Sequence, residues 1–383
     1  SVVVLVAGLS VMPPATAAEP ASGLSMFPPL GPLPPIDASV GWEKHEMQPE
    51  GGADLEAQPD EQTDNADYHT VFWPDERVRV SPTTSFPASA VTHVLVRTVV
   101  GDVLQCSGAF IGPGIVLTAA HCLYHLDYGA WARTVTIYPG ADGYSQPFGR
   151  ASATAAAVPS YWSSYGDPAL DIGVIVLDNP NLGYTTGWFS VGVFGTNTLL
   201  DPGFNPSTSG YPADKPFATQ WYAEKPAFVA VEESFLGLDI DMAGGQSGSP
   251  VWRGRDGLIV GVVSTESPSE NVAVRMTATT LAFLTNACND AGCSLSYYVE
   301  PASFEPIART WARTDRPVSD LSVSRTWMWG PSGYSGGIVE PYAEAAGGKR
   351  IVQYFDKSRM EITSDPSVSP DSVWYVTNGL LAK

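Results

Sequence analysis

Short β-rich runs, separated by turns of glycine, proline and aspartate, dominate the chain from about residue 71 onward. Valine, isoleucine, threonine and aromatic residues fill these runs, of which the clearest early ones are 90–96, 106–112, 115–118, 134–138 and 172–177. Such residues favour strands, and short strands with frequent turn signals are typical of a sandwich or barrel. A second set begins near Phe189 and includes 227–231 and 258–263, and 276–287 is the best helix candidate. The sequence therefore predicts an all-β fold with two groups of strands.

The balance of charge excludes two classes of partner. The 383-residue chain holds 40 Asp and Glu against 20 Lys and Arg, which gives a formal net charge of −20. A nucleic-acid-binding protein needs a basic face to hold phosphates, and an anionic membrane surface attracts basic segments. We therefore expect neither nucleic acid nor an anionic membrane surface among the partners.

The first seventy residues differ in composition from the rest of the chain. An apolar run at 1–12, too short to span a bilayer, is followed by small residues at 15–17. This pattern predicts a remnant of a secretory signal peptide over residues 1–18, and hence a secreted, extracellular protein with no membrane span in the mature chain. Residues 19–70 are proline-rich and hold eleven acidic residues against one basic residue, Lys44. We predict that this segment is disordered, as a linker or a propeptide.

Aromatic residues crowd the chain beyond Cys293. The most prominent are Trp311, Trp327, Trp329, Tyr334, Tyr342, Tyr354, Phe355, Trp374 and Tyr375. We predict a small aromatic-rich C-terminal module over residues 294–383. Two interpretations stay open: a packed β-module, or an accessory module whose exposed rings contact glycan or cell-wall polymer by stacking.

Three short segments carry side chains that suit one kind of chemistry. The segment Leu-Thr-Ala-Ala-His-Cys ends a strand in a turn that presents His121. In Ala-Leu-Asp-Ile-Gly, Asp171 heads an apolar strand, where a carboxylate needs a donor partner because burial of an unpaired charge is costly. In Gly-Gly-Gln-Ser-Gly-Ser-Pro, glycines flank Ser247 and permit a tight turn that can direct successive N–H groups to one point.

Together these residues supply the three roles of a serine hydrolase. A serine is a poor nucleophile until a base takes its proton, and a carboxylate must orient that base. The order His121, Asp171, Ser247 is that of chymotrypsin-like enzymes, whereas α/β-hydrolases have the order Ser, Asp, His. The rival acid Asp167 precedes Pro168 and is expected in a turn. No spacing of His, Cys or Glu predicts a metal site, and we expect no metal and no cofactor.

These motifs resemble those of trypsin-like serine peptidases, and more narrowly those of the bacterial glutamyl endopeptidases. The resemblance covers residues 71–290 and rests on the segments 71–80, 106–122, 171–173, 210–212, 244–250 and 273–277. It implies a peptidase domain over residues 71–293, made of two six-stranded antiparallel β-barrels with a short C-terminal helix. It further implies a secreted serine endopeptidase that cleaves protein or peptide substrates through an acyl-enzyme, with the N–H groups of Gly245 and Ser247 as the oxyanion hole.

The four cysteines fit an exported protein. The resemblance implies a bond between Cys106 and Cys122, and Cys288 and Cys293 enclose a short loop that a disulfide could close. Four cysteines allow three pairings, and the sequence alone does not choose among them. Export would let such bonds form and persist.

The residues of the specificity pocket leave two preferences open. In trypsin-like enzymes the residue six before the nucleophile lies at the base of the pocket, and here it is Asp241, which favours Arg or Lys before the scissile bond. Glu266 adds a second acid nearby. The glutamyl branch typically has a Thr and a His at the positions of Met242 and Val263, the latter followed by Ser264. The alternative is that Asp241 is a structural acid.

The segment around Val71 suggests a zymogen. In trypsin a new N-terminus pairs with an Asp immediately before the nucleophile, but Gln246 occupies that place here, so that ion pair cannot form. In the glutamyl branch the mature chain begins with a Val just before an Asp-Arg-like stretch, and its amino group helps to build the pocket. Val71, followed by Asp75 and Arg77, resembles it. We therefore expect residues 19–70 to be a propeptide that is removed near Val71.

The competing interpretation is a binding protein. A catalytically silent peptidase fold would then serve as a scaffold and act at the cell surface through the C-terminal module. The presence of His, Asp and Ser at all three catalytic positions favours the enzyme.

Overall fold

The structure is a computed structural model that describes residues 41–47, 71–72, 74–267, 270–300, 305–319, 322–330, 338–344, 348–363, 367–369 and 372–379. The predicted signal remnant at 1–18, most of the segment 19–70 and Tyr334 lie outside these residues. Within the described ranges, no helix is both long and apolar enough to cross a membrane.

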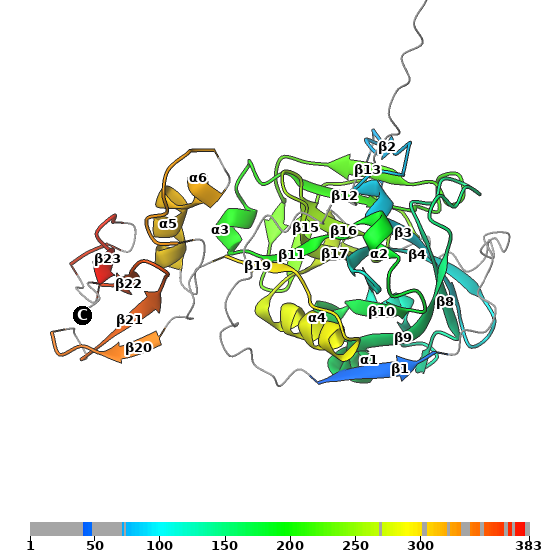
Figure 1. Cartoon of the computed structure of the whole chain (residues 1–383), viewed down its shortest axis with the longest axis horizontal. Coiled ribbons are helices and arrows are strands. Elements are labelled where there is room, and N and C mark those ends of the chain that lie inside the picture. The colour runs from blue at the N-terminus through cyan, green and yellow to red at the C-terminus, as the bar shows by residue number, and fades with distance from the viewer. Residues whose placement is uncertain are drawn as a thin grey trace, which may run out of the picture.

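The first barrel closes from six antiparallel strands (Figure 1). They are β3 (Val91–Arg97), β4 (Val103–Gly112), β5 (Ile115–Thr118), β8 (Thr134–Pro139), β9 (Ala151–Pro159) and β10 (Gly173–Leu177). The strand order β9-β10-β5-β4-β3-β8 becomes a ring because β8 also pairs with β9. Branched side chains such as Val116, Ile137 and Ile175 are fully buried inside it. A two-stranded hairpin, β6 (Tyr124–His125) with β7 (Ala130–Trp131), follows β5.

The second group of strands forms a ten-stranded sheet. Its members are β2 (Val78–Arg79), β11 (Ser190–Val193), β12 (Pro206–Gly210), β13 (Trp221–Glu224), β14 (Ala230–Val231), β15 (Phe235–Leu238), β16 (Pro250–Arg253), β17 (Leu258–Ser267), β18 (Glu270–Arg275) and β19 (Tyr297–Val299). The main order is β14-β15-β18-β17-β16-β12-β13-β2, and β11 bridges β17 and β19. This confirms the chymotrypsin-like, all-β prediction, with one difference. Hydrogen bonding among the described residues leaves the second sheet a half-barrel and not a closed six-stranded ring.

Helices are few and short in the barrel region. The predicted helix is confirmed as α4 (Ala278–Asp290), where the Thr277 side chain accepts from the N–H of Thr280 and the Thr280 hydroxyl accepts from that of Thr277. This reciprocal cap satisfies two of the N–H groups that a helix start leaves without partners. The remaining helices here are α1 (Ser160–Tyr165), α2 (Gly183–Thr186) and α3 (Thr196–Leu199), with 3₁₀ turns η1 (Ala88–Ala90), η2 (Ala120–Cys122) and η3 (Pro168–Leu170).

Part of the acidic N-terminal segment belongs to the first barrel. Strand β1 (Trp42–Glu46) pairs antiparallel with β9, with Trp42 opposite Pro159. The His45 ring stacks on Trp131 at 5.3 Å between centroids, and Met47 is buried. The expectation of disorder throughout residues 19–70 is therefore corrected for 41–47. The acidic composition did not reveal this strand, because backbone bonds to β9 and an aromatic pair leave no signal in the net charge of a segment.

The described residues from 305 onward form a separate group of elements, to one side of the barrels in Figure 1. The predicted boundary at residue 294 is corrected, because β19 pairs with β11 and so belongs to the second sheet. The separate group contains α5 (Glu305–Thr314), α6 (Arg316–Ser319) and an antiparallel sheet of β20 (Ile338–Pro341), β21 (Lys349–Tyr354), β22 (Arg359–Ile362) and β23 (Val376–Gly379). Trp311, Trp329 and Phe355 are buried in its core, whereas Trp374 is 74% exposed. Burial of these rings supports the packed β-module more than a stacking surface for glycan.

Candidate active site

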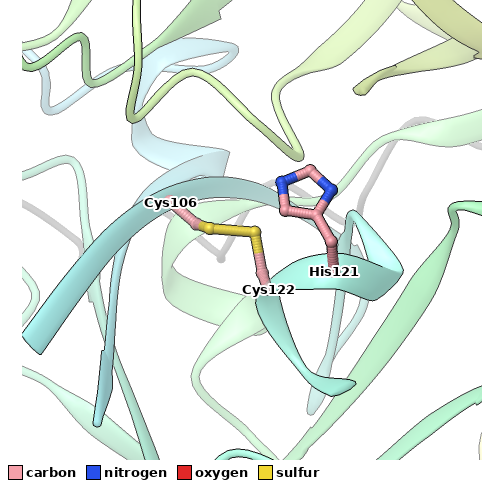
Figure 2. A group of neighbouring side chains, drawn as sticks. All are labelled: Cys106, His121 and Cys122. Carbon is pink, nitrogen blue, oxygen red and sulfur yellow. A yellow bond between two sulfur atoms is a disulfide. The ribbon is translucent and has the colours of Figure 1, made fainter. Parts of the chain in front are cut away.

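His121 lies on η2, directly after strand β5. Ala119 and Ala120 are fully buried, so the chain can turn here against the barrel wall without a large side chain in the way. The next residue, Cys122, is disulfide-bonded to Cys106 on β4, which fixes the turn to a neighbouring strand (Figure 2). The second expected bond, between Cys288 and Cys293, is also present.

Asp171 holds His121 through two hydrogen bonds. Its Oδ1 accepts from the backbone N–H of His121 at 2.8 Å, and its Oδ2 lies 2.7 Å from the ring Nδ1. The carboxylate side chain is 4% exposed and the imidazole 35% exposed. The ring is thus fixed in orientation, with Nδ1 on the carboxylate and Nε2 as the nitrogen that can exchange a proton.

The pair shifts both pKa values in the direction of an ion pair. Burial alone lowers the pKa of His121, but the charge of Asp171 and its hydrogen bond outweigh burial and raise that pKa above its ordinary value. Burial alone raises the pKa of Asp171, but the charge of His121 and the hydrogen bonds to the carboxylate outweigh it and lower the pKa. Asp171 therefore stays ionised and stabilises a protonated imidazole.

Ser264 on β17 makes the third hydrogen bond to this carboxylate. Its Oγ donates to Asp171 Oδ2 at 2.6 Å, and the serine is itself buried. The sequence had placed Ser264 in the specificity pocket, whereas the structure places it behind the acid. The bond also joins the two groups of strands at the site, since Asp171 precedes β10 of the first barrel.

Ser247 lies in a tight turn between Met242 and β16. Gly245 and Gly248 have φ angles of +87° and +85°, which favour glycine over residues with a side chain. A Cβ on Gly248 would lie 2.2 Å from the carbonyl oxygen of Ser107 and equally close to Thr118 Oγ1. The turn is therefore packed directly against the end of β5.

Ser107 on β4 fixes both sides of this turn. Its N–H donates to the carbonyl of Ser247 at 2.8 Å, and its Oγ donates to the carbonyl of Gly245 at 2.8 Å. The sulfur of Cys122, next to His121, lies 4.0 Å from the same Ser247 carbonyl. The structure thus brings the Ser247 turn and the His121 turn together. Sequence reasoning gave Ser107 no role, although it stands in the Cys-Ser-Gly motif that carried the resemblance.

Two other histidines near the site are poorly matched to act as a base. Burial lowers the pKa of His93 to about 4, although its hydrogen bond to Gln105 opposes the shift. Burial also lowers the pKa of His125 to about 4, and the nearby charge of His121 adds to that effect. Both rings stay neutral at pH 7, and a general base needs a pKa near the working pH.

Most of the predicted pocket residues are buried. Both oxygens of Asp241 accept backbone hydrogen bonds, from Phe72 at 2.5 Å and from Glu76 at 2.7 Å. Met242 and Val263 are fully buried, and Val71 is half-buried beside the segment that Asp241 holds. The Glu266 side chain lies outside the described part of the structure. These contacts favour the interpretation of Asp241 as a structural acid.

One cluster has the residue types of a metal site. Cys106, His121 and Cys122 place one sulfur or nitrogen each within 4.8 Å of one another. Zinc and similar ions bind thiolates, but the two sulfurs here are bonded to each other, as Figure 2 shows. His121 already uses Nδ1 on Asp171. This donor set does not fit a metal ion.

The fold is that of the chymotrypsin-like serine peptidases. The sequence model of the Trypsin family matches residues 80–282, which is more than half of the chain, and the chain belongs to this family. Within it, the chain is similar to the glutamyl endopeptidases. A glutamyl endopeptidase of Bacillus licheniformis is 39% identical over 184 residues, which are 48% of this chain and 54% of that protein.

Two further relatives extend the comparison. A Bacillus subtilis protein described as an extracellular metalloprotease is 38% identical over 185 residues, 48% of this chain and 58% of its own length. A solved structure of a Glu endopeptidase in complex with MPD aligns with a TM-score of 0.53 at 26% identity, covering 57% of this chain and 99% of that one. The chain thus spans little more than half the length of the curated relatives it matches.

Proposed function

We propose that the chain is a secreted serine endopeptidase in which Ser247 is the nucleophile, His121 the base and Asp171 the orienting acid. The observation that supports it most directly is the set of three hydrogen bonds to Asp171, from the N–H and Nδ1 of His121 and from the hydroxyl of Ser264. These bonds fix the imidazole tautomer that a neighbouring serine requires.

The reaction follows from these roles. Ser247 Oγ attacks the carbonyl carbon of a peptide bond while His121 Nε2 takes the hydroxyl proton, and the tetrahedral oxyanion forms. His121 then returns the proton to the leaving amine, which departs and leaves an acyl-serine. A water molecule attacks the acyl carbon, again with His121 as base, and releases the acid and the free serine.

The N–H groups of Gly245 and Ser247 are the proposed oxyanion donors. The positive φ of Gly245 and the hydrogen bond from Ser107 to its carbonyl set the direction of this turn. The loss of one such donor typically costs about 2.7–4 kcal/mol of transition-state stabilisation.

Two observations support a proposal for the residue that the enzyme prefers immediately before the scissile bond. Both oxygens of Asp241 accept hydrogen bonds from backbone N–H groups, which supports a structural role for this acid over a role in selecting lysine or arginine. The relatives at 39% and 25% identity are described as glutamyl endopeptidases, which favours glutamate before the scissile bond. Mass spectrometry of peptides cut from a whole proteome would test this, and a preference for Lys or Arg would reject it.

A zymogen is the proposed form in which the enzyme is made. Residues 19–70 would be the propeptide, and cleavage near Val71 would release the acidic segment, including β1. The anchoring of Phe72 and Glu76 on Asp241 supports a well-defined chain start just before these residues. N-terminal sequencing of secreted material checks this, and a mature start far from residue 71 would reject it.

A fluorophosphonate probe separates the enzyme from the competing binding protein. Such a reagent bonds covalently to an activated serine, so we expect labelling of the wild-type chain and none of Ser247→Ala. Absence of labelling in properly folded, processed wild-type protein would favour the binding scaffold.

A further inference from the structure

A buried arginine lies directly behind the turn that carries Ser247. The Arg77 side chain is only 1% exposed. It donates to Asp75 through Nε and Nη2, each at 3.0 Å, and to Asp214 through Nη1 at 3.0 Å and through Nη2. Its fifth bond runs from Nη1 to the side-chain oxygen of Gln246 at 3.2 Å. These five bonds account for all five donors of a guanidinium group.

The charges of this cluster balance without Gln246. Lys215 Nζ lies 2.6 Å from Asp75 Oδ2, so two cations face two carboxylates. The hydrogen bond from Arg77 holds the pKa of Asp75 well below its usual range, which keeps that carboxylate charged. The hydrogen bond from Arg77 to the neutral amide of Gln246 is therefore not needed to balance charge. It orients the Gln246 side chain, and the planar guanidinium group fixes that orientation.

Gln246 connects Arg77 to the turn that carries Ser247. Its Oε1 also accepts from the N–H of Ala243 at 3.1 Å, and its own N–H donates to the carbonyl of Ala243 at 3.1 Å. Arg77 thus holds the side chain that closes the turn over residues 243–246. Gly245 and Ser247, the proposed oxyanion donors, stand on either side of Gln246 in the chain.

The position of Arg77 does not depend on a free amino group. The chain from Phe72 to Arg77 folds around Asp241, whose two oxygens bind the N–H groups of Phe72 and Glu76. Neither contact uses the nitrogen of Val71, the group that cleavage at residue 71 would free.

We propose that Arg77 is a positioning residue for the Ser247 turn. Through Gln246 it holds this turn in its active conformation before the chain is cut at residue 71. The internal guanidinium then takes the place that a newly released N-terminus has in trypsin. This inference rests on the proposed role of Ser247. Propeptide removal then opens or completes the substrate pocket, and it does not assemble the oxyanion hole.

The first test uses the uncut precursor. A Thr70→Pro substitution hinders cleavage of the 70–71 bond, and mass spectrometry verifies that the chain is intact. A small fluorophosphonate carries no side chain for the specificity pocket, so its rate of reaction reports on the Ser247 turn and His121 alone. We expect the precursor to react within about threefold of the processed enzyme, far from the 10²–10³-fold loss typical of a missing oxyanion donor. A precursor that does not react, while the processed enzyme does, overturns the proposal.

The second test compares two arginines of the same segment. Arg77→Lys keeps the charge but loses the fork, and we expect fluorophosphonate labelling and kcat to fall about 10²-fold with little change in KM. Arg79→Lys is the matched control, because Arg79 is half exposed and pairs only peripherally with Asp142 at 2.6 Å. A folded Arg77→Lys variant that labels at the wild-type rate overturns the proposal.

Two further outcomes are interpreted separately: a variant that does not fold, and a wild-type enzyme that is not labelled. If Arg77→Lys does not fold, Gln246→Leu decides, because it leaves the four carboxylate bonds of Arg77 intact and removes the two bonds that Oε1 accepts, from Arg77 and from the Ala243 N–H. It is expected to fold with a lower Tm, because two buried donors lose their acceptor, and to show the same loss of labelling; a wild-type rate of labelling would again overturn the proposal. If the processed wild-type enzyme itself fails to label, the proposed function fails and not only this inference.

Discussion

Replacement of Asp171 by Asn tests the proposed mechanism through the tautomer of His121. In the structure Oδ1 accepts from the backbone N–H of His121, and Oδ2 faces both Nδ1 of the ring and the hydroxyl of Ser264. An asparagine must keep its carbonyl oxygen toward the backbone N–H, because its NH₂ group there would face another donor. The NH₂ group then points at Nδ1 and forces the ring proton onto Nε2.

This tautomer cannot accept the proton of Ser247. We therefore expect kcat for Asp171→Asn to fall about 10⁴-fold, as an aspartate-to-asparagine change does in a related triad, which corresponds to about 5.5 kcal/mol. The effect on folding is smaller, since the amide retains partners for each of the three bonds. Asp167→Asn is the control, because Asp167 only accepts from the N–H of Ala169 at the start of η3, and it should retain nearly full activity.

For the same Asp171→Asn variant, the direction in which the pH dependence of kcat/KM shifts can also be predicted. Activity requires neutral His121, so kcat/KM falls as the pH decreases through the pKa of this group. Asp171 raises that pKa in the wild-type enzyme, whereas burial lowers it. Without the carboxylate only the effect of burial remains, and the acidic limb of kcat/KM moves to lower pH. A loss of less than about tenfold in kcat, or an acidic limb that moves to higher pH, would refute the assigned roles.

Two further predictions concern packing. Gly248→Ala places a methyl group against the carbonyl of Ser107 at a positive φ, so we expect loss of fluorophosphonate labelling and a stability lower by roughly 1–3 kcal/mol. Gly143→Ala, with φ +64° and open space around the added Cβ, isolates the backbone effect and should keep normal labelling; equal damage in both variants would refute the packing argument. His45→Ala removes the ring stacked on a tryptophan and should lower the unfolding free energy of the precursor by about 0.5–1.5 kcal/mol. Lys44→Ala removes only partly exposed ion pairs, so in urea unfolding it should change the unfolding free energy by less than about 1 kcal/mol. A larger loss for Lys44→Ala than for His45→Ala would contradict the stabilising role of the His45 stack.

The catalytic candidates could be found from sequence because each lies in a short motif whose order carries the information. The fold class was equally accessible, since branched and aromatic runs mark most of the strands. Strand β9 was not recognised, because its sequence is Ala-Ser-Ala-Thr-Ala-Ala-Ala-Val-Pro and alanine is depleted in strands. The strand forms because its backbone pairs with β1 on one edge and β10 on the other, and its alanines are buried.

The contacts around Asp241 could not be predicted for a different reason. Its partners, Phe72 and Glu76, are backbone N–H groups 169 and 165 residues away, and a backbone group has no sequence signature. Family position suggested a substrate-binding acid, while the structure gives the carboxylate a role in chain anchoring. Arg77 was noted as part of an Asp-Arg-like stretch, but its bond to Gln246 spans 169 residues and exists only in the folded chain.

The pairing of β1 with β9 has a consequence for the behaviour of the protein in concentrated solution. On the edge of β9 away from β10, β8 pairs only with Ala151 and Ser152, and β1 covers the rest from Ala155 to Pro159. A sheet edge without a partner strand is a template for association with other chains. Loss of residues 41–47 would uncover this edge, so a form of the protein without β1 is expected to self-associate more than a form that keeps it.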